Sequence, residues 1–181
     1  MDSTSNDGLH LYSYWRSSAA WRVRIGLALK GLACTIEPVH LLRDGGQQHA
    51  DAYAALNPQQ LVPLLLHGQR AVYQSLAILE YLEEAWPASV PLLPATARER
   101  ARVRGLAQLV ACDIHPLNNL RVLQYLEREW DIPADGREAW ARHWMEQGLD
   151  AFEALVADTP ATGPFCLGGA PCLPDCCLMP Q

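Results

Sequence analysis

Apolar and polar positions follow a regular order through the first third of the chain. The apolar run at residues 9–14 indicates a buried strand, and residues 20–30 repeat apolar positions at helical spacing until Gly31 ends the helix. Residues 33–39 are rich in β-forming side chains and predict a second strand. A strand, a helix and a strand in this order predict a parallel pair with a right-handed crossover.

The next part of the chain predicts a hairpin followed by a helix. The expected elements are a loop at 41–48, a short helix at 50–56, a strand at 62–66 that starts with Val62-Pro63, a turn at 67–69, a strand at 70–73 and a strongly amphipathic helix at 75–86. The order of elements in the first half is therefore β-α-β followed by β-β-α.

Prolines mark the change to a second, helical half. Residues 87–94 contain three prolines and predict a linker, and Thr96 with Glu99 forms a capping box that opens a long helix. Pro116 is expected to kink or divide this helix, and helical periodicity continues at 117–130 and 136–156. The predicted organisation is a disordered tail at 1–8, an α/β domain at 9–86, a linker at 87–97 and a helical domain at 98–181.

Composition narrows the class of protein. Half of the 181 residues are apolar and 19% are charged, which is typical of a globular protein with a core. The net charge of −6 and the pI near 5.4 argue against a nucleic-acid binder. We find neither a signal peptide nor a membrane span, so we expect a cytoplasmic protein without a membrane partner. The six cysteines lack paired Cys-x2-Cys spacing, which predicts free thiols and no metal site.

Four groups of residues carry the candidate chemistry. They are Arg16-Ser17-Ser18 before the first helix, Gln48 in the Gly-Gly-Gln-Gln loop, Val62-Pro63 at a strand start, and Gln74-Ser75 at a helix start. The predicted topology places the Val-Pro turn and both helix starts along one edge of the sheet. A hydroxyl at a helix start polarises an anion such as a thiolate. The chain has no cysteine beside these serines, so the thiol must arrive with a small molecule.

At this point the sequence resembles the zeta class of the glutathione transferases, and within it the maleylacetoacetate isomerases. The matching runs are Tyr14-Trp15-Arg16-Ser17-Ser18, Trp21-Arg22-Val23-Arg24-Ile25, Asp44-Gly45-Gly46-Gln47-Gln48, Leu56-Asn57-Pro58, Gln74-Ser75-Leu76-Ala77-Ile78 and Asp113-Ile114-His115-Pro116-Leu117-Asn118-Asn119-Leu120. The resemblance implies a thioredoxin-like α/β domain (β-α-β-β-β-α or close) followed by an all-α domain. It also implies a homodimer.

The resemblance assigns roles residue by residue. Glutathione is the implied cofactor, and Ser17 and Ser18 lie at its thiol, with Ser18 as the activating hydroxyl. Val62, before a cis Pro63, pairs with the cysteinyl backbone. Gln74 and Ser75 bind the γ-glutamyl carboxylate, and Gln48 holds the glycyl end. Arg16 faces an acidic small-molecule substrate, and His115, Asn119 and Arg121 reach the site from the helical domain, the first two toward glutathione and Arg121 toward the substrate.

The implied reaction is the cis–trans isomerisation of maleylacetoacetate to fumarylacetoacetate by reversible thiolate addition, in tyrosine and phenylalanine breakdown. Alternatives are a maleylpyruvate isomerase, a glutathione-binding protein without turnover, and transfer to halogenated acids. Leu120 stands where the maleylpyruvate pattern has Arg, which favours maleylacetoacetate. On local sequence alone, Ser17, Ser18 and Ser75 are also explained as helix caps and Arg16 as part of a surface ion pair. His115 is also explained as a buried hydrogen-bonded histidine, and Gln74 and Arg121 as solvated surface residues.

The sequence departs from the family pattern at three places. Ala19 replaces a cysteine, and Cys172 stands where a hydroxyl normally caps a buried helix ahead of Asp175. The helical domain also ends early against the family pattern, which predicts a truncated domain with exposed apolar surface at Trp140, Trp144 and Phe152.

Overall fold

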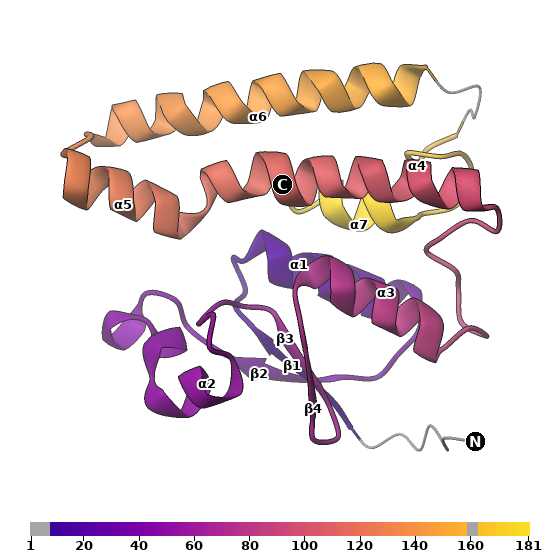
Figure 1. The fold of residues 1–181 in the computed structure, drawn as a ribbon, viewed down its shortest axis with the longest axis horizontal. Helices are drawn as coiled ribbons and strands as arrows, with labels where there is room; N and C mark the ends of the chain where they lie inside the picture. The colour runs from indigo at the N-terminus through magenta and orange to yellow at the C-terminus, as the bar shows by residue number, and fades with distance from the viewer. Residues whose placement is uncertain (1–7, 159–162) are drawn as a thin grey trace. The chain divides into compact units, whose positions relative to one another are not determined.

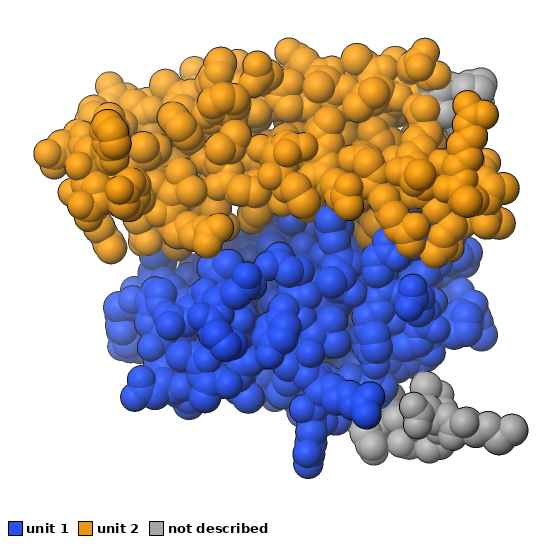
Figure 2. Space-filling view, in the orientation of Figure 1, with its two compact units in different colours: residues 1–93, 180 blue, residues 94–179, 181 orange. Residues whose placement is uncertain are grey.

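The computed structural model describes residues 8–158 and 163–181, which fall into two compact units (Figures 1 and 2). Unit 1 comprises residues 1–93 and 180, and unit 2 comprises residues 94–179 and 181. All but the last residue of the tail predicted at 1–8 lie outside the described residues. The division falls inside the segment predicted as a linker, and the exact domain boundaries stay a prediction.

Unit 1 is built on a four-stranded mixed sheet with the strand order β2-β1-β3-β4. Its elements are β1 (Leu9–Ser13), α1 (Ser18–Leu29), β2 (Thr35–Pro38), two short 3-10 helices (Arg43–Gly45 and Gln47–His49), α2 (Asp51–Leu56), β3 (Leu64–His67), β4 (Arg70–Tyr73) and α3 (Ser75–Ala85). β1 pairs with β2 in parallel and with β3 antiparallel, and β3 pairs antiparallel with β4. The predicted α/β order and the parallel pair are confirmed.

Several element boundaries differ from the prediction by one to three residues, and two of them have a clear local reason. α1 begins at Ser18 rather than at residue 20, because Ser17 is the N-cap. β3 begins at Leu64 rather than at residue 62. Proline has no N–H to donate to a strand ladder, so pairing starts only after Pro63. The predicted loop at 41–48 contains the two 3-10 turns.

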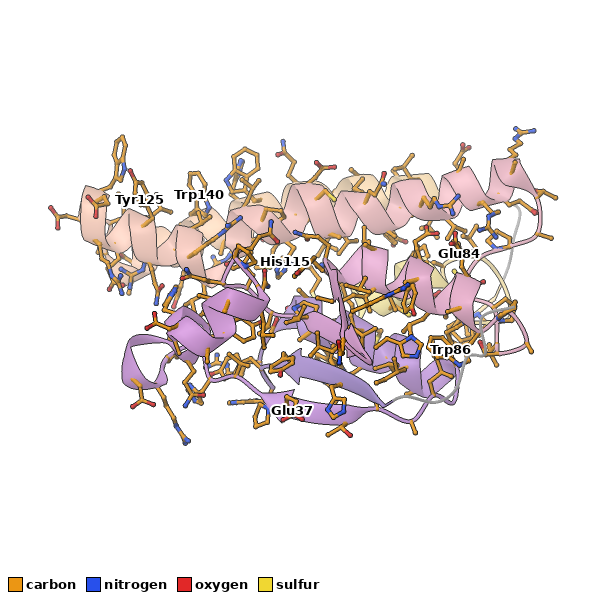
Figure 3. The ribbon with its side chains drawn as sticks, turned by 60° about the horizontal axis from the view of Figure 1, so that its bottom comes forward. Glu37, Glu84, Trp86, His115, Tyr125 and Trp140 are labelled. Carbon is orange, nitrogen blue, oxygen red and sulfur yellow. The ribbon has the colours of Figure 1, made fainter. Side chains whose placement is uncertain are left out.

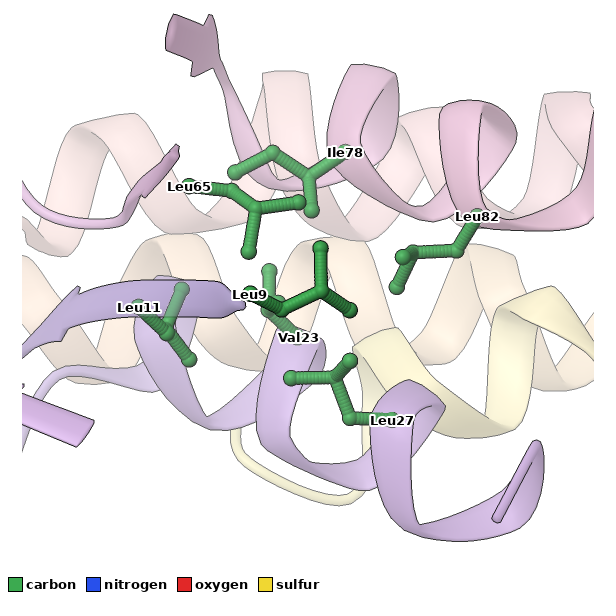
Figure 4. Packing of buried hydrophobic residues seen from close by; sticks show 7 residues of the cluster. All are labelled: Leu9, Leu11, Val23, Leu27, Leu65, Ile78 and Leu82. Carbon is green, nitrogen blue, oxygen red and sulfur yellow. The ribbon is translucent and has the colours of Figure 1, made fainter. Parts of the chain in front are cut away.

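The core of unit 1 lies on both faces of this sheet. One cluster joins β1 and β3 to α1 and α3 and consists of Leu9, Leu11, Val23, Leu27, Leu65, Ile78 and Leu82 (Figure 4). The other consists of Tyr14, Val39, Tyr53, Val62 and Leu64. Neighbouring strand residues point to opposite faces, so Leu64 and Leu65 divide between the two clusters.

The helices α1 and α3 pack together without room for a side chain at Gly26. A Cβ at Gly26 would overlap the Cδ2 methyl of Leu79, and Leu79 is fully buried. Glycine is therefore required here by the close approach of the two helices.

One turn further along the same two helices, Lys30 and Glu83 form a buried ion pair. The Nζ of Lys30 lies 2.7 Å from Oε2 of Glu83 and also donates to the carbonyl of Val90 at 3.1 Å. The Glu83 carboxylate accepts from the N–H groups of Leu92 at 3.0 Å and Leu93 at 3.3 Å. Burial by itself would raise the pKa of Glu83, but these N–H donors and Lys30 outweigh burial and hold the pKa below its ordinary value.

Unit 2 is helical throughout its described elements. They are α4 (Ala97–Gln108), a π-helical turn (Leu109–Ile114), a 3-10 turn (His115–Asn118), α5 (Leu120–Trp130), α6 (Ala134–Ala157) and α7 (Leu173–Leu178). Thr96 caps α4 through a hydrogen bond from the N–H of Glu99 at 3.3 Å. The predicted division at Pro116 is confirmed, because the regular helix gives way to the π and 3-10 turns around this proline.

The start of α7 is organised by the carboxylate of Asp175. It accepts from the N–H of Cys172 at 2.8 Å, from the thiol of Cys172 at 3.0 Å and from the N–H of Cys166 at 3.0 Å. A capping box therefore forms although a thiol replaces the expected hydroxyl. Burial, together with Asp175, raises the pKa of Cys166 to about 12, so this thiol stays protonated.

The expected exposure of apolar surface in unit 2 is wrong for Phe152, which is buried at 4% exposure. Trp140 and Trp144 are half-buried, and their rings meet edge to face. The indole N–H of Trp140, which is labelled in Figure 3, donates to the carbonyl of Leu117 at 2.8 Å. Trp140 and Trp144 thus find partners within unit 2, whereas Leu149 and Leu155 of the same helix are exposed.

Substituting Gly26→Ala should lower the free energy of unfolding by about 1–3 kcal/mol, because the added methyl overpacks the contact with Leu79. Urea denaturation followed by circular dichroism measures the change. Gly105→Ala is the matched control, because a Cβ at this exposed helical glycine meets no atom within 4 Å. It should leave stability unchanged or raise it by up to about 1 kcal/mol. Equal losses in both variants would contradict the packing argument.

Substituting Glu83→Gln should lower the free energy of unfolding at neutral pH by about 1–3 kcal/mol, because Lys30 loses its counter-charge. The pKa of Glu83 is lowered in the folded state, so its contribution is complete above the ordinary glutamate pKa of about 4.3 and fades as the pH falls further. The difference between wild type and variant should therefore narrow toward about pH 3.

Denaturation curves from neutral to acid pH measure this narrowing. Glu84→Gln is the control, because Glu84 is exposed on the same helix (Figure 3) and its replacement should leave the free energy of unfolding nearly unchanged. A difference for Glu83→Gln that stays constant as the pH falls would contradict the role of its charge.

Candidate functional site

Four chain segments that carry candidate site residues adjoin the sheet of unit 1 at one edge, which is formed by the ends of β1, β2 and β4 and the start of β3. Across this edge Tyr12 of β1 pairs with Leu64 of β3, and Leu64 pairs with Tyr73 of β4. The last pair of the parallel ladder joins Ser13 to Pro38. The starts of α1 and α3 and the Val62-Pro63 turn therefore adjoin this edge, as the sequence predicts, and the loop after β2 adjoins it as well.

The two serines before and at the start of α1 have different surroundings. The Oγ of Ser17 accepts from the N–H of Ala20 at 3.1 Å, so Ser17 is the N-cap of α1. Ser18 is the first residue of the helix and is half-buried. Its hydroxyl has no hydrogen-bond partner among the described residues. The capping interpretation therefore holds for Ser17, and it leaves the hydroxyl of Ser18 for another role.

The turn that carries these serines is fixed by Arg24 of α1. Its guanidinium donates to Oγ of Ser13 at 2.6 Å, to the carbonyl of Tyr14 at 3.2 Å and to the carbonyl of Trp15 at 3.2 Å. Trp15 and Arg16 project from this turn, with the Arg16 guanidinium 5.6 Å from the Trp15 ring centroid. Arg24 lies within a run quoted for the family resemblance, but the sequence does not reveal that it anchors the turn.

The start of α3 combines a buried hydroxyl, a buried cation and an uncapped helix end. The Oγ of Ser75 accepts from Nη1 of Arg22 at 3.4 Å, and both residues are buried. No side chain caps α3, whose N-cap position is Gln74. The first N–H groups of a helix attract an anion, and Arg22 adds a full positive charge beside them. Arg22 is a functional candidate that the sequence analysis missed, because its partner lies 53 residues further along the chain.

The turn before β3 presents an extended backbone at the same edge. The Val62-Pro63 peptide bond is cis, as the resemblance implies. The register between β1 and β3 begins at Leu64, so Val62 precedes the ladder. The carbonyl of Leu61 accepts from the hydroxyl of Tyr53 at 2.6 Å and from Nδ2 of Asn57 at 2.8 Å, which holds the turn in place.

The loop after β2 presents Gln48 and is held by His40. The Nδ1 atom of His40 accepts from the N–H groups of Leu42 at 3.2 Å and Arg43 at 3.1 Å. The backbone N–H of His40 donates to Oε1 of Gln47 at 2.8 Å. Gln48 donates from Nε2 to the carbonyl of Leu41 at 3.5 Å and contacts Nε2 of His49 at 3.0 Å.

Three predicted site residues belong to unit 2. His115 is half-buried (Figure 3), and its Nε2 lies 3.3 Å from Nδ2 of Asn119. The Oδ1 of Asn119 accepts from the N–H of Arg121 at 3.1 Å and caps α5. Arg121 is exposed. These three residues are thus grouped at one helix start within unit 2.

Metal-ligating side chains do not gather anywhere in the described part of the chain. Residues 8–158 and 163–181 contain no group of three or more His, Cys, Asp or Glu side chains arranged to hold a metal ion. The cysteines among these residues are free thiols, and burial raises the pKa of Cys34 to about 11 and that of Cys176 to about 12. These thiols are therefore protonated and weakly nucleophilic near neutral pH.

Comparisons with known proteins agree with this geometry. The family model for the glutathione S-transferase N-terminal domain matches residues 11–89. A probable maleylacetoacetate isomerase from Vibrio cholerae is 46% identical over 173 residues, which cover 96% of this chain and 79% of that protein.

Two solved structures share the fold at similar identity. The holo structure of a maleylpyruvate isomerase, described as a bacterial zeta-class glutathione S-transferase, superposes with a TM-score of 0.90 at 46% identity and covers 94% of this chain and 79% of that one. A maleylacetoacetate isomerase from Methylobacterium extorquens, with bound malonate and glutathione, gives a TM-score of 0.85 at 44% identity over 94% of this chain and 79% of that one.

Both kinds of comparison lead to one family and confirm the resemblance drawn from the sequence motifs. The thioredoxin-like domain and the helical part that follows it are shared with these relatives. The chain belongs to the zeta class of the glutathione transferases.

Proposed function

We propose that this chain is a glutathione-dependent cis–trans isomerase that converts maleylacetoacetate to fumarylacetoacetate. The observation that carries the proposal is the division between two adjacent serines. Ser17 caps α1, and the Ser18 hydroxyl at the same helix start has no partner in the part of the chain that the structure describes. The identity of 46% to a probable maleylacetoacetate isomerase supports the choice of reaction.

The residues at the sheet edge fit glutathione, which is an extended peptide with a carboxylate at each end. The uncapped start of α3, with Ser75 and Gln74, suits the γ-glutamyl carboxylate, and the buried guanidinium of Arg22 supplies a counter-charge. The backbone of Val62 before Pro63 lies outside the ladder and suits pairing with the cysteinyl part. Gln48 reaches the glycyl end from the loop after β2.

The chemistry requires a thiolate, and the start of α1 is able to stabilise one. Bound glutathione supplies the thiolate that adds reversibly to the cis double bond of the substrate. Lowering a thiol pKa by about two units requires roughly 2.7 kcal/mol. A hydrogen bond from the Ser18 hydroxyl to a charged sulfur contributes about 1.5–3 kcal/mol, and the helix start adds about 0.3–1 kcal/mol. One serine and one helix end are therefore sufficient.

Binding of the acidic substrate is assigned to arginines. Arg16 is exposed beside Ser17 and Ser18, and a guanidinium binds a carboxylate through two parallel hydrogen bonds. Arg121 is proposed to contribute from unit 2. His115 and Asn119, which contact each other at 3.3 Å, are proposed to bind glutathione from the same unit.

Maleylpyruvate isomerisation is the second candidate, because a maleylpyruvate isomerase superposes with a TM-score of 0.90. The exposed Leu120 at the first position of α5 favours maleylacetoacetate, since an arginine here would supply a further contact for the shorter diacid. Comparing kcat/KM for the two substrates distinguishes the candidates.

The oligomeric state and the cellular location of this chain are also proposals. We propose a homodimer, which α5 supports by exposing Tyr125 (Figure 3) and Trp130. We propose a cytoplasmic location, supported by cysteines that are free thiols in the described residues. None of the described helices is both long enough and apolar enough to cross a membrane.

Ser18→Ala should lower kcat/KM for maleylacetoacetate by about 100-fold or more, because the thiolate loses its hydroxyl donor. Steady-state kinetics with saturating glutathione measures the loss. Ser17→Ala is the matched control: it should lower the free energy of unfolding by about 1 kcal/mol through loss of the cap, whereas Ser18→Ala should leave stability unchanged. A Ser18→Ala variant with normal turnover would remove this residue from catalysis.

Arg16→Ala should raise KM for maleylacetoacetate by about tenfold or more, because a charge-assisted contact to the substrate carboxylate is lost. The KM for glutathione should not change. Arg43→Ala serves as control, since Arg43 is exposed on the loop after β2 and has no proposed contact with the substrate. An unchanged substrate KM in Arg16→Ala would exclude Arg16 from substrate binding.

A further inference from the structure

The turn at residues 57–62 contacts Gln74 directly and reaches Gln48 through His49, and both glutamines are proposed to hold glutathione. Asn57 is buried at 2% exposure and fixes the turn from within. Its Oδ1 accepts from the N–H of Gln59 at 3.1 Å, and its carbonyl accepts from the N–H of Gln60 at 2.9 Å. The side chains of Gln59 and Gln60 therefore start from a rigid backbone.

Gln59 orients the amide of Gln74 at the start of α3. The Nε2 atom of Gln74 donates to Oε1 of Gln59 at 2.9 Å. The backbone of Gln74 has a φ of 68°, in the region that L-residues rarely adopt. Its position depends on its surroundings for support, and Gln59 supplies the contact that fixes the amide plane.

Gln60 reaches the other glutamine through a histidine. The Oε1 atom of Gln60 lies 2.6 Å from Nδ1 of His49, and Nε2 of His49 lies 3.0 Å from Nε2 of Gln48. An amide oxygen only accepts, so Nδ1 of His49 carries the proton and donates it to Gln60. The Nε2 atom of His49 is then an acceptor, and it receives a hydrogen bond from the amide NH₂ of Gln48.

The surroundings of the Gln48 amide favour a single orientation. Its Oε1 atom is buried and has no hydrogen-bond partner among the described residues. Its Nε2 atom lies 3.0 Å from the ring nitrogen of His49 and 3.5 Å from the carbonyl of Leu41. The second distance is at the limit for a hydrogen bond, so one N–H is committed to His49 and the other remains available to a ligand carboxylate. Turning the amide over would place its oxygen against both acceptors, so these contacts keep the NH₂ group in place.

We propose that Gln59 and Gln60 are positioning residues that orient the amides binding opposite ends of glutathione. Gln59 acts through Gln74 on the γ-glutamyl end, and Gln60 acts through His49 and Gln48 on the glycyl end. This inference rests on the proposed function of the site. It adds that two adjacent residues, neither of which touches the tripeptide, control its two ends separately.

A shortened ligand separates the two ends. γ-Glutamylcysteine has the γ-glutamyl end of glutathione but lacks the glycine. Calorimetric titration of the full chain with each ligand gives two dissociation constants for every variant. Gln60→Ala should not add backbone strain, because alanine and glutamine both carry a Cβ and are equally strained at the φ of 54° found at this position.

Gln60→Ala should raise the dissociation constant of glutathione by about three- to tenfold, the usual effect of one lost hydrogen bond. The dissociation constant of γ-glutamylcysteine should stay unchanged. His49→Phe keeps a ring but removes both nitrogens, and it should reproduce this result. The double variant should be no weaker than either single variant, because all three break the same chain of contacts. Gln59→Ala should raise the dissociation constants of both ligands by the same factor.

Gln69→Ala is the control for loss of a glutamine, because Gln69 is exposed in the turn between β3 and β4. It should leave both dissociation constants unchanged. Equal weakening of the two ligands by Gln60→Ala, or no weakening at all, would overturn the inference. The inference would also be overturned if the wild-type chain bound glutathione and γ-glutamylcysteine equally tightly, since Gln48 would then not hold the glycine. A wild-type chain that does not bind glutathione would overturn the proposed function as well.

Discussion

The buried ion pair between Lys30 and Glu83 completes a seam of contacts that fixes α1 against α3. The other two contacts are Arg22 with Ser75 and Gly26 with Leu79. Each partner lies four residues after the previous one on both helices, so each helix contributes one face. A charge removed from water is destabilising unless it is paired and hydrogen-bonded. Lys30 and Glu83 meet this requirement only when the helices keep this register.

The same register determines where the two helix starts lie. Ser18 is one turn before Arg22 on the seam face of α1, and Ser75 is the first residue of α3. A shift of α1 along α3 would break the ion pair and also remove the cation beside Ser75. Stability and the proposed chemistry therefore depend on one arrangement, with the buried ion pair at the far end of the seam and the proposed activating hydroxyl of Ser18 at the near end. The ion pair also holds the segment 90–93, because Lys30 donates to the carbonyl of Val90 and Glu83 accepts from the N–H groups of Leu92 and Leu93.

Periodicity in the sequence was sufficient to predict the elements of unit 1 and the effect of Pro116, because these depend on neighbours within a few residues. It also placed the helix starts at one sheet edge, since β-α-β and hairpin topologies leave few choices. The contacts of Arg22 and Lys30 could not be predicted, because each joins residues 53 positions apart. A pattern shows which face of a helix is buried, but not which side chain it meets. Likewise, residues 90–93 are predicted as part of a linker, because the pattern does not show that Lys30 and Glu83 bind their backbone.

The two helix starts at the site show how the chain separates structure from binding. α1 has a side-chain cap, so its fold does not depend on a ligand, and the next residue is left for chemistry. α3 has no side-chain cap, and its first N–H groups require an acceptor from elsewhere. An anion bound there completes the helix, so part of its binding free energy becomes stability of the fold. Through the seam, that stability extends to α1, and a ligand carboxylate at α3 would also hold Ser18 in place.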